Sequence, residues 1–162
     1  NVPLKKIAEG LSNFAGVKSR LQTKSGFAGA KVIDDTYNAN PLSMKAAIDV
    51  LAVNQGQRIF VMGDMAELGD DTAEMHAEIG AYAKAAKVET FYALGKLTAQ
   101  AVIAFGASGR HFKSVEALVD TLKKQMNPNV TVLVKGSRSA RMERVVDLIQ
   151  VAKMTENKEG KH

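Results

Sequence analysis

With 162 residues, 46% of them hydrophobic, the chain is long enough for one compact domain with a substantial core. Its net charge of +5 comes from dispersed residues rather than from a cluster interleaved with aromatics, which argues against a nucleic-acid-binding surface. It has no cysteine for disulfides or thiolate metal sites, no signal peptide and no apolar run of the ~20 residues that a membrane span needs. We therefore expect a soluble, cytoplasmic protein without a membrane partner. We also expect it to be a monomer.

The two ends of the chain differ from its middle. Leu4, Ile7 and Leu11 recur at helical spacing and predict a short amphipathic helix over residues 3–14, which Gly16 ends. Residues 19–24 should be extended. After Val151 the chain is polar, and we expect a frayed tail over residues 153–162.

Between these ends, apolar runs alternate with helical patterns. The runs lie at residues 32–33, 59–62, 91–94, 111–112 and 130–134, and helical spacing of apolar residues covers 44–51, 75–86, 115–122 and 142–149. Nearly continuous apolar runs are typical of parallel strands covered on both faces. The pattern therefore predicts an α/β, Rossmann-like fold, an open, mostly parallel, twisted sheet with helices on both faces. Three residues should cap helices: Asn40, which precedes Pro41, Ser114 and Ser139.

In such a sheet, ligands bind beyond the carboxyl ends of the strands, where helices begin. The first loop there, residues 34–41, holds two carboxylates, a phenol and two amides. Asp35 suits a ribose hydroxyl or an amine, and Asn38 or Asn40 suits a peptide. The alternative is that Asp34, Thr36 and Asn40 are turn and cap residues.

Two further loops carry charge. Four residues surround a predicted helix start, where cations and backbone N–H groups can converge on one carboxylate or phosphate: Lys135, Ser137, Arg138 and Arg141. The alternative is a solvated helix face bearing Arg138 and Arg141. In residues 63–69, Asp64 and Glu67 are candidates to hold an ammonium group.

The histidines and the missing motifs limit these readings. His76, His111 and His162 are more simply explained as structural or solvated. The sequence has no GxxxxGK[ST] phosphate loop, HExxH motif, serine elbow or GxGxxG run. Without further information, these residues indicate an anion-binding α/β domain.

Three blocks resemble a known family. They are VIDDTYNANPLSMKAAIDVL at residues 32–51, VMGDMAELG at 61–69 with His76 downstream, and LVKGSRSARME at 133–143. Together they resemble the motifs of the third domain of the bacterial Mur ligases, in particular the members that handle D-alanyl-D-alanine. The resemblance extends over about residues 3–150.

The resemblance implies an ATP-dependent, amide-forming ligase of peptidoglycan synthesis. ATP would phosphorylate the carboxylate of UDP-N-acetylmuramoyl-tripeptide, and the amine of D-alanyl-D-alanine would attack the acyl phosphate. In the family, the phosphate loop and most Mg²⁺ ligands belong to a central domain, and the UDP-sugar site to an amino-terminal one. Residues 1–19 would then be the end of the central domain and a linker, and residues 20–152 the carboxy-terminal domain, inactive alone.

Site residues are implied in the same way. The nucleotide set is Arg20, Asp35, Tyr37 and Asn38, the substrate set is Asn38, Asn40, Asp64, Glu67, Lys135, Ser137 and Arg138, and no metal ligand is expected in this chain. Two alternatives stay open. A phosphoacceptor signalling domain would use Asp34, Asp35, Asp64 and Lys135, although it leaves the two polar motifs unexplained; a plain nucleotide-binding module would lack dipeptide affinity.

Overall fold

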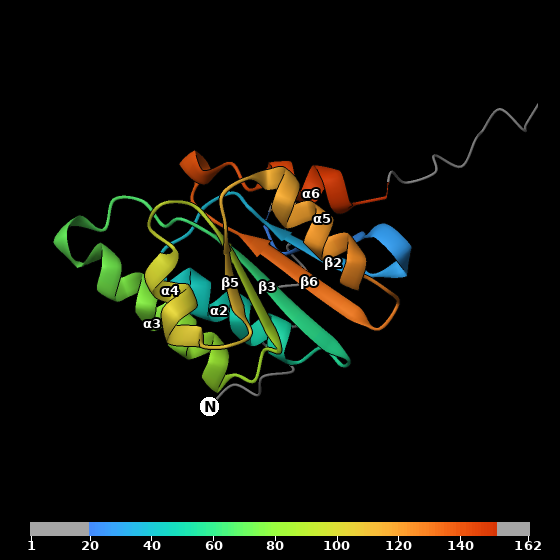
Figure 1. Cartoon of the computed structure of the whole chain (residues 1–162), viewed down its shortest axis with the longest axis horizontal. Coiled ribbons are helices and arrows are strands. Elements are labelled where there is room, and N and C mark those ends of the chain that lie inside the picture. Colours follow the sequence, from blue (N-terminus) through green and yellow to red (C-terminus); the bar gives the residue numbers. More distant parts are fainter. Residues whose placement is uncertain (1–19, 152–162) are drawn as a thin grey trace, which may run out of the picture.

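A six-stranded sheet organises residues 20–151, the part of the chain described by this computed structural model (Figure 1). The strands are β1 (Gln22–Ser25), β2 (Lys31–Asp35), β3 (Gln57–Gly63), β4 (Thr90–Leu94), β5 (Gly109–Phe112) and β6 (Val130–Lys135). Their order is β1-β2-β6-β3-β4-β5, and only the β1–β2 pair is antiparallel. The predicted open, mostly parallel sheet is confirmed.

Helices cover both faces of this sheet. They are α2 (Pro41–Ala52), α3 (Thr72–Ala85), α4 (Ala99–Phe105), α5 (Val115–Gln125) and α6 (Glu143–Ile149), with short 3-10 turns η1 (Phe27–Gly29), η2 (Gly69–Asp71) and η3 (Arg138–Ala140). In Figure 1, α5 and α6 lie on one side of the sheet and α2, α3 and α4 on the other. Helix α4 was not predicted, because it is only seven residues long and exposes Ile103. No helix within residues 20–151 has the length and apolarity to span a membrane.

Strand alternation divides the core into two layers. Val32 and Val132 pack with α5 and α6, whereas their neighbours Ile33 and Leu133 pack with α2, α3 and α4. Side chains on successive strand residues point to opposite faces, so each strand contributes to both layers. Central strand β6 is buried along its whole length. The predicted helix at residues 3–14, its end at Gly16, His162 and the polar tail lie outside the described residues.

Two of the three predicted helix caps are confirmed. The Asn40 side chain accepts a hydrogen bond from the Ser43 N–H at 2.8 Å, and the Ser43 hydroxyl accepts one from the Asn40 N–H at 3.0 Å. Ser114 caps α5 by accepting from Ala117 N–H. The prediction for Ser139 was wrong. The chain makes the η3 turn before α6, so Ser137 is the capping residue there, and α6 starts at Glu143 after Met142, which provides no side-chain cap.

Gly80 sets the closest approach of α3 and α4. A Cβ at this position would overlap the carbonyl group of Ala101, which is backbone and cannot rotate away. Helix propensity alone favours alanine over glycine by about 1 kcal/mol. We expect the substitution to be destabilising instead, because overpacking typically costs about 1–3 kcal/mol. After the propensity gain, Gly80→Ala should lower the free energy of unfolding by up to about 2 kcal/mol in urea denaturation.

The neighbouring exposed residue provides the control. Ala81→Gly should lower the free energy of unfolding by about 1 kcal/mol, through the loss of helix propensity alone, because Ala81 faces solvent. A Gly80→Ala protein more stable than the wild type would show that the two helices separate at no cost.

Candidate functional site

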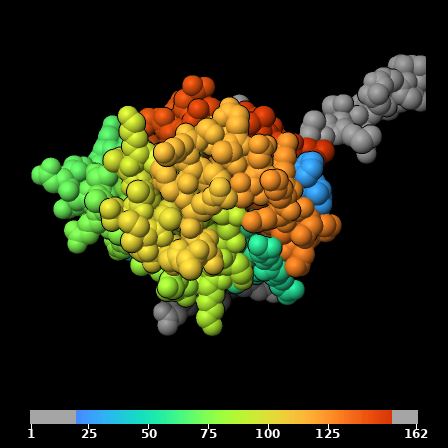
Figure 2. Space-filling model, viewed as in Figure 1, coloured from blue at the N-terminus to red at the C-terminus, as the bar shows by residue number. Residues whose placement is uncertain are grey.

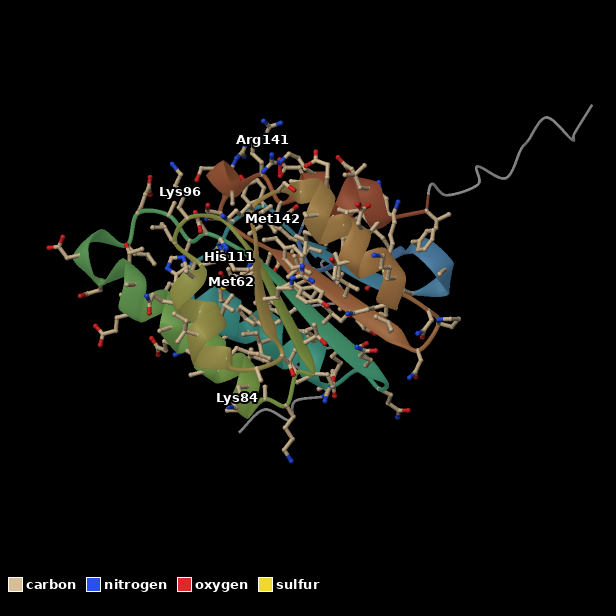
Figure 3. All side chains as sticks on the ribbon, in the orientation of Figure 1. Met62, Lys84, Lys96, His111, Arg141 and Met142 are labelled. Carbon is tan, nitrogen blue, oxygen red and sulfur yellow. The ribbon has the colours of Figure 1, made fainter. Side chains whose placement is uncertain are left out.

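The carboxyl ends of the parallel strands bring four loops to one edge of the sheet, which we call the rim: residues 36–40, 64–68, 95–98 and 136–142. Figure 3 shows Lys96 and Arg141 at this edge and Lys84 at the opposite end of the molecule. The space-filling view shows the segment after β6, in red, along the top of the molecule (Figure 2). Segments distant in sequence therefore share one edge, as predicted.

A buried ion pair joins the first loop to the last. Lys135 is 3% exposed, and its Nζ donates to Asp35 Oδ2 at 2.8 Å and to the Asn38 carbonyl at 2.9 Å. Burial raises the pKa of the Asp35 carboxyl above its ordinary value of 3.8, and the Lys135 ammonium opposes that rise. The ammonium predicted to meet a substrate carboxylate is thus bound to the protein's own loop.

The rest of the first loop is built from turns and caps. Asp34 is buried, and its Oδ1 accepts from both the N–H and the hydroxyl of Thr36, while its Oδ2 accepts from Lys24. Asn38 Oδ1 accepts from the following backbone N–H. The turn-and-cap alternative is therefore confirmed for Asp34, Thr36 and Asn40. Because Asn40 uses its side-chain oxygen as a cap, its NH₂ group is the part left to meet a ligand.

Tyr37 stands between two arginines. The Arg20 guanidinium lies 4.1 Å and the Arg138 guanidinium 5.1 Å from the centre of its ring, distances typical of cation–π contacts. The phenol is 38% exposed. Arg138, and after it Arg20, lowers the pKa of Tyr37 below its ordinary value of 10.0 by favouring the phenolate. Both guanidiniums are held at the rim and face solvent beside an aromatic ring.

An open cleft of about 610 Å³ lies next to this stack, on the α6 side. Tyr37, Arg138 and Arg141 line it together with one further cation and three acidic residues, which are Lys24, Asp34, Glu143 and Asp147. A second, shallower cleft of about 450 Å³ lies beyond β4 and β5 and includes Lys96, Lys113 and Arg144. Cationic side chains line both openings near the rim, and in the second cleft they outnumber the acidic ones, an excess that suits anionic ligands.

The second loop is held by internal hydrogen bonds. Asp64 Oδ1 accepts from the Leu97 N–H at 2.9 Å. His76 is fully buried; its Nε2 accepts from the Met65 N–H at 3.0 Å, so its Nδ1 must donate to the Thr72 carbonyl, 2.7 Å away. The structural reading of His76 is confirmed. Glu67 is exposed at the rim with a φ of 60° and stays a candidate for an ammonium ligand.

The last loop combines a cap with an exposed charge. Ser137 is buried, and its hydroxyl accepts from the Ala140 N–H at 3.3 Å, so its predicted contact with substrate is not evident in this conformation. Arg138 follows it and is exposed. Among the described residues, no three His, Cys, Asp or Glu side chains gather into a group that could hold a metal ion.

Two contributors to the site were not predicted. Lys24 neutralises Asp34, and His111 Nε2 lies 2.6 Å from the Gly95 carbonyl. Lys24 is ten residues from Asp34, and no local motif links them. The antiparallel pairing of β1 with β2, which brings Lys24 opposite Val32, is the signal that would have found this pair.

Comparison with known proteins is consistent with this geometry. Residues 19–138 match the family described as Mur ligase, glutamate ligase domain. The chain is 41% identical to UDP-N-acetylmuramoyl-tripeptide--D-alanyl-D-alanine ligase of Escherichia coli (strain K12) over 146 residues, and 35% identical to the Bacillus subtilis (strain 168) protein of the same name over 153 residues. These matches cover 89% and 88% of this chain but 32% and 33% of those proteins. The chain spans about a third of the length of the curated relatives it matches.

Solved structures agree. MurF from Acinetobacter baumannii superposes with a TM-score of 0.74 at 33% identity, over 91% of this chain and 34% of that one. MurF ligase from Thermotoga maritima, solved in complex with ADP, gives a TM-score of 0.71 at 27% identity, over 82% of this chain and 30% of that one. The chain therefore belongs to the Mur ligase family, whose glutamate ligase domain it carries over residues 19–138.

Proposed function

We propose that this chain supplies the dipeptide site and part of the ATP site of a ligase that joins D-alanyl-D-alanine to UDP-N-acetylmuramoyl-tripeptide. The relatives that it matches over most of its length carry that activity in their names. In the reaction, the tripeptide carboxylate takes the γ-phosphoryl group of ATP and releases ADP. The dipeptide amine then attacks the acyl carbon, loses a proton and expels phosphate.

The observation that carries the proposal is the rim, where two exposed arginines flank Tyr37 beside the buried Asp35–Lys135 pair. Joining two anionic substrates requires charge neutralisation and orientation before chemistry. We assign Arg20, Asp35, Tyr37 and Asn38 to the nucleotide, and Asn38, Asn40, Glu67 and Arg138 to the dipeptide. Asp64, Lys135 and Ser137 support these residues through the loops that they hold.

The remaining parts belong to other domains. We assign the phosphate loop, the Mg²⁺ ligands and the UDP-sugar site to domains outside residues 20–152, and residues 1–19 to the end of the ATP-binding domain. Closure of that domain onto the rim would exclude water and bring the acyl phosphate to the dipeptide amine. A bacterial cytoplasm, where ATP is present, is the proposed location, and a monomer the proposed state.

Asp35 provides the test of the nucleotide assignment. Lys135 uses one of the roughly four acceptor positions of its carboxylate, so a ribose hydroxyl can still be bound. In the complete enzyme, Asp35→Ala should raise the KM for ATP about tenfold, the loss of one hydrogen bond to a charged group. The KM for ATP is measured from the rate of ADP release that requires both the tripeptide substrate and the dipeptide.

The control is Asp120→Ala on the exposed face of α5, which removes the same charge far from the rim and should leave the KM for ATP unchanged. An Asp35→Ala enzyme with wild-type activity and ATP saturation would contradict the assignment. A wild-type enzyme without dipeptide-dependent ADP release would contradict the proposed function itself. Intact-mass spectrometry after incubation with acetyl phosphate and Mg²⁺ distinguishes a ligase domain from a phosphoacceptor domain, since only the phosphoacceptor domain gains a phosphoryl group.

A further inference from the structure

Asp64, at the end of β3, contacts two other loops of the rim at once. Its Oδ1 accepts from the Leu97 N–H at 2.9 Å, and its backbone carbonyl accepts from the Ser137 N–H at 2.9 Å. We propose that Asp64 is a positioning residue, which aligns the loops after β4 and β6 for dipeptide binding and does not itself hold the substrate ammonium. The inference rests on the proposed function and replaces the role first expected for this side chain.

The loop after β4 is built around this carboxylate. Gly95 has a φ of 128°, and a Cβ at this residue would overlap the Asp64 carboxylate, so the loop backbone lies directly against it. Two more side chains hold the Gly95 carbonyl: His111 Nε2 at 2.6 Å and the Thr98 hydroxyl at 2.9 Å. The backbone of residues 95–98 is therefore held by one hydrogen bond within the loop and by contacts from two other places, His111 on β5 and Asp64 directly after β3.

The loop after β6 depends on Asp64 through the backbone. Ser137 donates its N–H to the Asp64 carbonyl and caps η3 through its hydroxyl, and η3 begins with Arg138. A shift of Asp64 is thus transmitted to the arginine that we assign to the dipeptide carboxylate. Oδ1 accepts from the Leu97 N–H and both carboxylate oxygens lie against Gly95, so the side chain contacts the backbone of the neighbouring loop.

Asparagine separates the two roles of Asp64, because it keeps an oxygen that accepts from Leu97 N–H but removes the negative charge. In the complete enzyme, Asp64→Asn should keep the KM for D-alanyl-D-alanine within about 3-fold of the wild type, and Asp64→Ala should raise it about tenfold or more. The KM for ATP should move less than that for the dipeptide. An ammonium-binding carboxylate predicts instead that Asp64→Asn is as defective as Asp64→Ala, which would overturn the inference.

Gly95→Ala perturbs the same contact from the opposite side without changing any charge. It should raise the KM for the dipeptide as Asp64→Ala does, and an unchanged value would contradict the role given to this contact. If Asp64→Ala does not fold, Asp64→Asn and Gly95→Ala still decide the question.

Backbone amide NMR of the 162-residue chain gives a readout without catalysis. The Leu97 and Arg138 amide resonances should shift in Asp64→Ala and in Gly95→Ala, much less in Asp64→Asn, and not in the control Asp120→Ala. Absent shifts at both amides in Asp64→Ala would overturn the inference. If instead the wild-type enzyme shows no dipeptide-dependent ADP release, the proposed function fails, and these amide shifts still report whether Asp64 positions the loops.

Discussion

Lys135→Met is expected to lower the free energy of unfolding by about 3–5 kcal/mol, the largest effect that we predict for a single side chain on stability. The substitution keeps the bulk of the side chain but leaves the Asp35 carboxylate buried without its ammonium partner and the Asn38 carbonyl without its donor. Removing one member of a buried ion pair lowers the free energy of unfolding by far more than the intact pair contributes to it, because the remaining charge cannot be solvated. Urea denaturation followed by circular dichroism measures the loss.

The loss should depend on pH in a defined direction. Burial already raises the pKa of Asp35, and removing Lys135 removes a group that opposes the rise. A buried carboxyl with a raised pKa in the folded state destabilises the fold when it is ionised. This loss of stability is complete above the pKa of the folded state, and it becomes smaller as the pH falls through that pKa toward 3.8. The deficit of Lys135→Met should therefore be largest near neutral pH and smaller in acid.

Two comparisons test this explanation. Lys45→Met breaks the more exposed Lys45–Glu78 pair and should cost under about 1 kcal/mol. Adding Asp35→Asn to Lys135→Met removes the stranded charge and should recover at least about half of the stability. A double variant no more stable than Lys135→Met would show that the loss does not come from an unpaired carboxylate.

Arg138→Ala is expected to raise the KM for D-alanyl-D-alanine by about 10- to 150-fold, the largest effect that we predict on catalysis. The estimate corresponds to one hydrogen bond between charged groups, about 1.5–3 kcal/mol. Arg138 is exposed and stands over Tyr37, whereas Lys135, another cation of the same motif, is buried against Asp35. The direct contact with the dipeptide carboxylate should therefore come from Arg138, with Lys135 acting through the loop that it holds.

Steady-state kinetics with varied dipeptide at saturating ATP measure this effect. Arg138→Lys keeps the charge but loses the planar fork, so it should recover only part of the affinity. Arg110→Ala is the matched control, because Arg110 also stands over an aromatic ring, Phe112, at 4.7 Å, but lies on β5. Unchanged dipeptide kinetics in Arg138→Ala would refute the assignment.

Much of the fold could be predicted because its determinants are local. The apolar run at residues 130–134 is buried on both faces, as expected for a central parallel strand. The Asn40–Pro41 pair begins α2 through a side chain and a fixed φ that act within three residues. Helix α4 escaped prediction because its seven residues are too few for a periodic pattern to stand out.

The candidate site was predicted as a set of residues but not as a set of contacts. The residues at the carboxyl ends of the predicted strands identified Asp35, Asp64 and Lys135, since a parallel sheet alone places these ends together at the rim. They did not show that Lys135 is neutralised by Asp35 or that Asp64 holds the backbone of Leu97.

The sequence by itself thus determined the fold class, the edge of the sheet at which we expect ligands to bind and the family motifs, because periodicity and capping depend on residues within a few positions of each other. Only the tertiary structure decided which charges are neutralised internally and which remain exposed for a ligand. Strand β6 lies between β2 and β3, which brings Lys135 to a carboxylate 100 residues away and leaves Arg138 in solvent. Strand order depends on long-range packing, and no local pattern encodes it.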